Sequence, residues 1–171
     1  MTAGFGIKNS IESLIHNQYG ELIHYDSVAT FTDGVTQEDM DTLEGDLSAD
    51  GHIDDFLLNC GYSDDVKSSE DTETAEYVIV DDKNAFKDYV TLRTRRKHND
   101  VVLGDSGVVI TEKLSKDLGV KKGDKITVTS SAGKQAEAVV SSITEMYVNH
   151  YVYISTEYYN ELFENIPEHN R

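Results

Sequence analysis

The sequence has few residues that could cross-link it or carry it through a membrane. Its 171 residues include one cysteine, Cys60, so an internal disulfide is excluded and the redox compartment stays open. Cys60 ends a short apolar run, which favours a buried small side chain over a nucleophile. No run approaches the roughly 18 apolar residues of a membrane-spanning helix.

Basic residues are also scarce. Fifteen Lys and Arg against 32 Asp and Glu give a formal net charge of −17. A field of this sign repels nucleic acid and anionic lipid, which excludes both as direct ligands. Between residues 33 and 82 the only base is Lys67, and a basic cluster follows this acidic half. We expect the cluster to pair with the acidic half; its members are Arg93, Arg95, Arg96 and Lys97.

The motifs of common catalytic sites are missing. The sequence contains no G-x-S-x-G elbow, no phosphate loop and no H-E-x-x-H pattern, and none of its six histidines has a histidine partner four residues on. We therefore expect neither enzymatic activity nor a cofactor. His150 is expected to be a half-buried, hydrogen-bonded histidine, with a ligand or pH-sensing role as the alternative.

Residues 46–57 partly match a calcium-binding loop. Asp46, Ser48 and Asp50 supply oxygen atoms at the first, third and fifth positions, and a glycine follows. The twelfth position is Leu57, where the loop needs a bidentate glutamate. We expect a turn after a helix, and calcium binding remains the alternative.

Local patterns are clearest between residues 108 and 163. Residues 108–110 predict a strand, and Thr111 is placed to begin a helix that buries Leu114 and Leu118. Gly119 suits the left-handed end of that helix. Turns at 122–124 and 131–133 separate strands around 126–128, 136–143 and 147–154, and a helix starts at Ser155 and ends before Pro167.

The first hundred residues read as alternating strands and helices. Strands are predicted at 22–31, 53–62, 77–80 and 92–96. Thr36 and Asp39 form a capping-box pattern for one helix, and Asn84 is placed to cap another. Residues 63–76 are rich in carboxylates and poor in apolar side chains, so a mobile acidic loop is expected. The order matches a ferredoxin-like βαββαβ unit.

Four stretches resemble a known family. They are residues 107–128 (GVVITEKLSKDLGVKKGDKITV), residues 147–163 (YVNHYVYISTEYYNELF), and the pair GFGIKNSI and QYGELIHYD near the start. Together they resemble the extracytoplasmic domain of FtsX/MacB-type ABC transporter permeases, in the Gram-positive form, over about half of the chain.

The resemblance implies an α+β fold with a MacB-like periplasmic core architecture. It divides the chain into a membrane-proximal stalk helix (1–20), a porter-like, ferredoxin-like lobe (21–100, with the acidic loop 63–76), a small helix-and-antiparallel-sheet lobe (101–155), and a C-terminal membrane-proximal helix (156–171). Both ends should then lie close together and point the same way, towards the membrane helices that the domain joins.

The resemblance also implies a non-catalytic domain at the extracellular side of the cell membrane. Such a domain contacts cargo or a cell-surface partner, or transmits ATP-driven motion across the membrane. Its implied partners are the permease's own transmembrane helices, a cytoplasmic ABC ATPase and a second permease subunit. Two alternatives remain: a stand-alone cytosolic small-barrel binding module, and an acidic, cation-responsive surface domain.

Tyrosines gather near the C-terminus and form a candidate interaction surface, because a tyrosine ring supplies apolar area and its hydroxyl a polar tip. The alternative is that the rings cover the sheet beneath the following helix. The residues concerned are Tyr147, Tyr151, Tyr153, Tyr158 and Tyr159.

Overall fold

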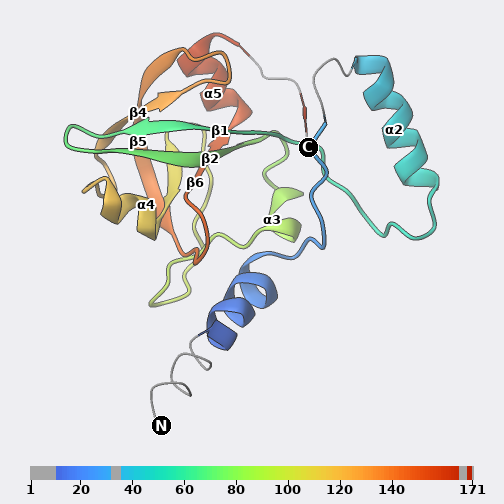
Figure 1. Cartoon of the computed structure of the whole chain (residues 1–171), viewed down its shortest axis with the longest axis horizontal. Helices are drawn as coiled ribbons and strands as arrows, with labels where there is room; N and C mark the ends of the chain where they lie inside the picture. The colour runs from blue at the N-terminus through green and yellow to red at the C-terminus, as the bar shows by residue number, and fades with distance from the viewer. Residues whose placement is uncertain (1–10, 32–35, 166–168, 171) are drawn as a thin grey trace.

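The computed structural model describes residues 11–31, 36–165 and 169–170. Its centre is a closed β-barrel, with a helix projecting on one side and a second helix, α2, standing away on another (Figure 1). Among the described residues, no helix combines the length and the apolar character needed to cross a membrane.

Six strands close the barrel in the order β1-β2-β6-β3-β5-β4. Their bounds are β1 Cys60–Lys67, β2 Thr72–Val80, β3 Val108–Thr111, β4 Lys125–Thr129, β5 Gln135–Thr144 and β6 Tyr151–Ser155. The pairs β2–β6 and β3–β5 are parallel, and the other neighbours are antiparallel. Four of the six neighbouring pairs therefore join strands that are not consecutive in the sequence.

Three neighbouring strands, β2, β6 and β3, are covered on both faces. Successive side chains of a strand point to opposite faces. Val108 and Ile110 accordingly enter the core inside the barrel, whereas Val109 enters a second core on its outer face. Val152 and Tyr153 divide in the same way. Burial on both faces explains why these segments read as continuous apolar runs.

The expected α+β fold, with a ferredoxin-like βαββαβ lobe beside a small helix-and-sheet lobe, is wrong. The barrel combines strands from residues 60–80 with strands from residues 108–155, so the expected division near residue 100 separates no two cores. The local order of elements was misleading because β2 pairs with β6, more than 70 residues later, through Glu76↔Tyr151 to Val80↔Ser155.

The acidic loop expected at 63–76 is also wrong, because these residues belong to the β1–β2 hairpin. The register explains how so acidic a hairpin can form. Each carboxylate opposes an uncharged residue, for example Asp64↔Ala75, Asp65↔Thr74 and Val66↔Glu73. Like charges are thus kept from direct opposition, the arrangement that destabilises strand pairs.

The helices of the first hundred residues were predicted better than the strands. Helix α2 (Gln37–Ala49) begins with the predicted capping box between Thr36 and Asp39. Helix α3 (Phe86–Tyr89) follows a turn in which Asp82, rather than Asn84, accepts backbone N–H bonds. The predicted strands at 22–31 and 92–96 are reduced to isolated bridges, since neither segment finds a continuous partner.

In the second half the predicted elements are largely confirmed. Helix α4 (Glu112–Asp117) follows β3 directly and ends at Gly119, which has a φ of 69°. Helix α5 (Thr156–Phe163) starts at the predicted cap, Ser155. It packs on the barrel and buries Phe163, so its described part belongs to the core inside the barrel. Residues 166–168 and 171 of the predicted C-terminal segment lie outside the described residues.

The two ends of the described chain lie apart, whereas the resemblance implies that they lie close together (Figure 1). The helix starting at residue 11 projects from the lower side of the barrel (Figure 1), and residues 1–10 of the expected stalk lie outside the described residues. Asn170 is bound beside the start of β1, where its side chain exchanges two hydrogen bonds of 2.8 Å with Gly61. Its carbonyl also accepts from the Phe31 N–H at 2.9 Å.

Candidate functional site

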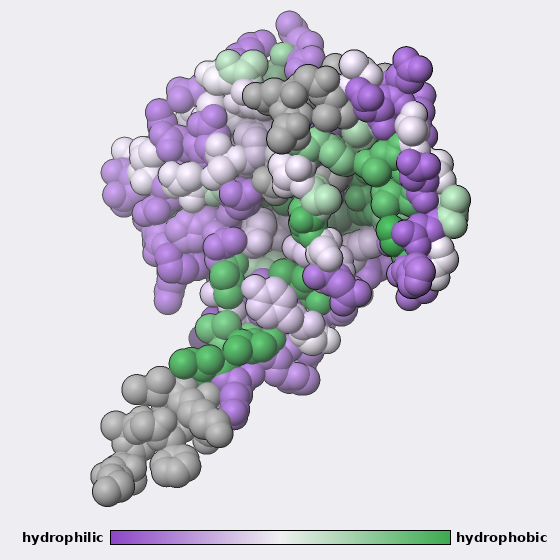
Figure 2. Space-filling model, turned by 45° about the vertical axis from the view of Figure 1, so that its right-hand side comes forward, coloured by the Kyte–Doolittle hydropathy of each residue, from purple (hydrophilic) through white to green (hydrophobic). Residues whose placement is uncertain are grey.

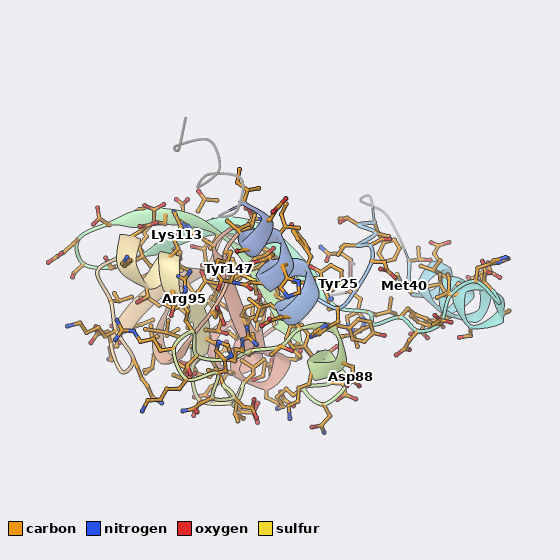
Figure 3. The ribbon with its side chains drawn as sticks, turned by 90° about the horizontal axis from the view of Figure 1, so that it is seen from below. Tyr25, Met40, Asp88, Arg95, Lys113 and Tyr147 are labelled. Atoms are coloured by element: carbon orange, nitrogen blue, oxygen red, sulfur yellow. The ribbon has the colours of Figure 1, made fainter. Side chains whose placement is uncertain are left out.

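The strongest candidate for a functional site is the contact between the N-terminal helix and the barrel. Residues 11–16 are α-helical and continue into the π-helix η1 (Asn17–Leu22). Figure 3 shows this helix lying across the barrel beside Tyr147. We name the contact the helix–barrel joint; it consists of Gln18, Glu21, Arg93, Glu145 and Tyr147.

Gln18 anchors the helix. Its side chain is buried, and its Oε1 accepts from the Tyr147 N–H at 2.8 Å while its Nε2 donates to the Met146 sulfur at 2.9 Å. Beside it, Asn17 donates to the Tyr147 hydroxyl at 3.0 Å. One side chain thus satisfies a backbone N–H of the segment that follows β5, which ties the helix to the barrel.

Arg93 links the helix and the barrel by charge. Its guanidinium donates to Glu21 Oε2 on the helix at 2.5 Å and to Glu145 Oε2 after β5 at 2.8 Å. The Glu145 side chain is 2% exposed. The Glu145 N–H also donates to the Arg93 carbonyl at 2.8 Å, so backbone pairing brings the two side chains together.

Tyr147 completes the joint. Its hydroxyl donates to Glu145 Oε1 at 2.5 Å, and the Arg95 guanidinium lies 4.7 Å from its ring centre. Both oxygens of the buried Glu145 carboxylate are therefore hydrogen-bonded. Burial, followed by the nearby Glu145 carboxylate, raises the pKa of the Tyr147 hydroxyl.

The charges of the joint are suited to holding a position rather than to moving a proton. Burial alone would lower the pKa of Arg93, but the hydrogen bonds to Glu21 and Glu145 raise it. The Arg93 hydrogen bond lowers the pKa of Glu21. An arginine stays protonated in proteins, so it can act as neither general acid nor general base. The network fixes how the helix sits on the barrel.

The basic cluster pairs differently from the prediction. Arg93 bonds to Glu21 and Glu145, and Arg95 lies 3.3 Å from Glu112. These partners lie outside the acidic segment 33–82, which folds as the separate helix α2 and the β1–β2 hairpin. The predicted pairing of the cluster with that segment is therefore wrong for the two arginines that make these ion pairs.

The tyrosine surface is not formed as predicted. Tyr153, Tyr158 and Tyr159 are buried in the two cores and cannot be an exposed surface. Tyr147 and Tyr151 are half-buried and pack against the outer core. The alternative, in which the rings cover the sheet and pack beneath the last helix, agrees with this burial.

The partial calcium motif also finds a structural explanation. Asp46 and Ser48 lie within α2, and Asp50 caps its end. The Asp50 carboxylate accepts from the His52 N–H at 2.9 Å. The predicted turn after a helix is confirmed. His150, as predicted, is mostly buried and hydrogen-bonded, with a side chain 12% exposed and 2.9 Å from Lys113 Nζ.

Sequence analysis found parts of the joint without assembling them. Gln18 falls in the expected stalk helix of residues 1–20, Arg93 in the basic cluster and Tyr147 among the tyrosines. Glu145 was missed. Its signal is a single carboxylate placed between apolar residues of the β5–β6 segment, a position where burial demands a charged partner.

No protein-family model and no curated protein matches this chain. A proposed function therefore has to be supported by the geometry of the joint and by the sequence resemblance described above.

Proposed function

We propose that this chain is the extracellular, non-catalytic domain of an ABC transporter permease, and that it transmits motion of the membrane helices. The N-terminal helix receives the movement, and the helix–barrel joint passes it to the barrel as one rigid unit. On this proposal the partners are the permease's own transmembrane helices and a cytoplasmic ABC ATPase. The cargo, or the protein that receives the motion, binds the barrel or α2.

The observation that carries this proposal is the hydrogen-bonded joint, in which the Gln18 and Glu145 side chains are buried. A surface helix held by apolar contacts alone can slide or rotate at small cost. This helix is held by Gln18 and by the Glu21–Arg93–Glu145 ion pairs, which are satisfied in one arrangement. Buried polar networks of this kind favour a unique geometry over maximal stability.

The outer face of the same helix adds support. Ile11 and Ile15 are each 52% exposed and Tyr19 is 58% exposed, at a spacing of four residues that places them on one side. Figure 2 shows hydrophobic residues gathered on the projecting helix. An apolar stripe on a helix that leaves the domain suits contact with a neighbouring membrane-proximal helix.

The location can be tested on the full-length protein in intact cells. Val102, which is 71% exposed, is replaced by cysteine, and the cells are treated with a membrane-impermeant maleimide. We expect labelling of Val102→Cys without lysis. The parent protein is a matched control, because its only cysteine within this chain, Cys60, is 4% exposed. Labelling that requires lysis would contradict an extracellular location.

The rigidity of the joint can be tested on the chain itself. Spin labels at Tyr19→Cys and Val102→Cys report the distance between the helix and the barrel by double electron–electron resonance. We expect one narrow distribution, and a broad one when Gln18→Leu is added, because leucine keeps the bulk but removes the acceptor for the Tyr147 N–H. Ser13→Ala, an exposed change on the same helix, should leave the distribution narrow. An unchanged distribution in Gln18→Leu would remove the support for a lever.

A stand-alone binding module is a second candidate, and barrel closure favours it. Small closed barrels bind ligands or proteins without further domains. Recovery of the full-length protein in the soluble fraction, together with labelling of Val102→Cys only after lysis, would select this candidate.

A further inference from the structure

Three side chains from separate elements meet beside the last residue of α4. They are Glu73 of β2, Asp117 at the end of α4 and His150, which directly precedes β6. One ligating atom of each lies within 4.8 Å of the others. Within the described residues, this is the one such group of three His, Cys, Asp or Glu side chains.

The position of His150 is fixed by the backbone. Its carbonyl accepts from the Glu76 N–H at 2.8 Å, which continues the parallel pairing of β2 with β6. Its Nε2 lies 3.2 Å from Asp117 Oδ2, and its Nδ1 lies 3.9 Å from Glu73 Oε2. Ligands about 2.0–2.1 Å from a tetrahedral Zn²⁺ are separated by about 3.3 Å, so the His150–Asp117 pair already has the required spacing.

A cation already occupies this place. The Lys113 ammonium lies 2.7 Å from Asp117 Oδ2 and 2.9 Å from His150 Nε2, between the two atoms that would bind a metal. The Lys113 side chain is 62% exposed, so it can turn away into solvent; Figure 3 labels it on α4.

We propose that Glu73, Asp117 and His150 form a binding site for a divalent transition-metal ion such as Zn²⁺, and that Lys113 holds the cation position when the metal is absent. His150 Nε2 and Asp117 Oδ2 bind the ion in their present positions. Glu73, whose side chain is 37% exposed, rotates to supply the third ligand, and water completes the coordination. The ion brings two positive charges to a group with two carboxylates, where the Lys113 ammonium brings one.

The donor set selects the class of ion. An imidazole nitrogen with two carboxylate oxygens suits Zn²⁺ and its first-row neighbours. Calcium prefers six to eight oxygen ligands and gains little from imidazole. The proposed site is therefore distinct from the partial calcium motif in α2, and Ca²⁺ serves as the control cation.

Binding would join three elements of the barrel. The ligands come from β2, α4 and the residue before β6, so the ion cross-links the hairpin to the second half of the chain. A ligand that binds only the folded state raises the melting temperature as its concentration increases. The expected readout is a rise in melting temperature with Zn²⁺ and none with Ca²⁺.

The test uses the full chain without an added histidine tag. Zn²⁺ binding is measured by isothermal titration calorimetry, and Co²⁺ is used as a spectroscopic probe of tetrahedral nitrogen and oxygen coordination. His150→Gln and Glu73→Gln should each weaken Zn²⁺ binding about tenfold or more, since even outer contacts of metal ligands are worth 10–100-fold. His52→Gln is the matched control, because His52 lies 2.9 Å from Asp50 but is 97% exposed and has no third ligand.

Lys113→Gln tests the proposal with a variant that should bind Zn²⁺ more tightly, whereas the preceding variants should bind it more weakly. Removing the ammonium that competes with the ion for Asp117 and His150 should strengthen Zn²⁺ binding about fivefold or more. Unfolding of a destabilised variant would weaken Zn²⁺ binding. Tighter binding by Lys113→Gln could therefore not result from a folding defect. Equal affinity of the parent, His150→Gln and Lys113→Gln proteins would overturn the site, as would weaker binding by Lys113→Gln or an equal response to Ca²⁺.

Discussion

Replacing Arg93 by alanine is expected to lower the free energy of unfolding by about 3–5 kcal/mol. The substitution leaves the Glu145 carboxylate, which is 2% exposed, without its charged partner. Removing one member of a buried ion pair costs far more than removing both, because the remaining charge stays desolvated. Urea unfolding followed by circular dichroism measures the change.

Two further variants separate this effect from simple loss of positive charge. Arg95→Ala removes a guanidinium of which 51% of the side chain is exposed, and should cost about 0–1 kcal/mol. Adding Glu145→Gln to Arg93→Ala should recover part of the lost stability, since the amide carries no charge. If Arg93→Ala and Arg95→Ala destabilise equally, the joint is not a buried ionic network.

Replacing Tyr159 by alanine is expected to lower the free energy of unfolding by a similar amount, about 3–5 kcal/mol, because it removes apolar packing from the core. Tyr159 is fully buried, and its ring centre lies 4.7 Å from that of Phe163 within the core inside the barrel. Truncation would leave a cavity between α5 and the strands. Because a domain is stable by only about 5–15 kcal/mol, the loss should appear as a marked fall in the urea midpoint.

Glu161→Ala, two residues further along α5, is the matched exposed control and should change stability by less than about 0.5 kcal/mol. A Tyr159→Ala protein with the urea midpoint of this control would mean that α5 does not hold the barrel.

Local features of this fold could be predicted from sequence where one or two neighbouring residues determine them. Thr36 and Asp39 form the predicted capping box, and Gly119, at the end of α4, adopts the left-handed conformation expected of it. Each of these features is decided within four residues, by a hydrogen bond or by the steric freedom of glycine.

The barrel could not be predicted in this way, because its decisive contacts are distant. The parallel pairing of Tyr77 with Val152 has no local signal, and a ferredoxin-like order of elements fits the first hundred residues equally well. The hairpin at 60–80 was missed because its carboxylates suggested a loop. What allows strands there is the register, which becomes visible only when both strands are placed side by side.

The candidate site was unpredictable for a related reason. Gln18, Arg93 and Glu145 occupy three segments with no shared motif, and each alone resembles an ordinary surface residue. These residues can be recognised as a site only when they are buried together, and that burial depends on the packing of the helix of residues 11–22 against the barrel. By contrast, the partial calcium loop, which the sequence kept only as an alternative, lies at the end of a helix where local hydrogen bonds satisfy the Asp50 carboxylate.

The non-sequential order of the strands around the barrel has a consequence for biosynthesis. The hairpin of residues 60–80 has β6 as one neighbour and β4 as the other, and the register between β1 and β4 is a single pair, Lys67↔Thr127. A growing polypeptide therefore cannot complete the barrel until residue 155 has left the ribosome. High sequence separation between paired segments slows folding, and until then the early hairpin stays exposed to chaperones and proteases. The many carboxylates of this unpaired hairpin oppose aggregation, because they repel other copies of the incomplete chain.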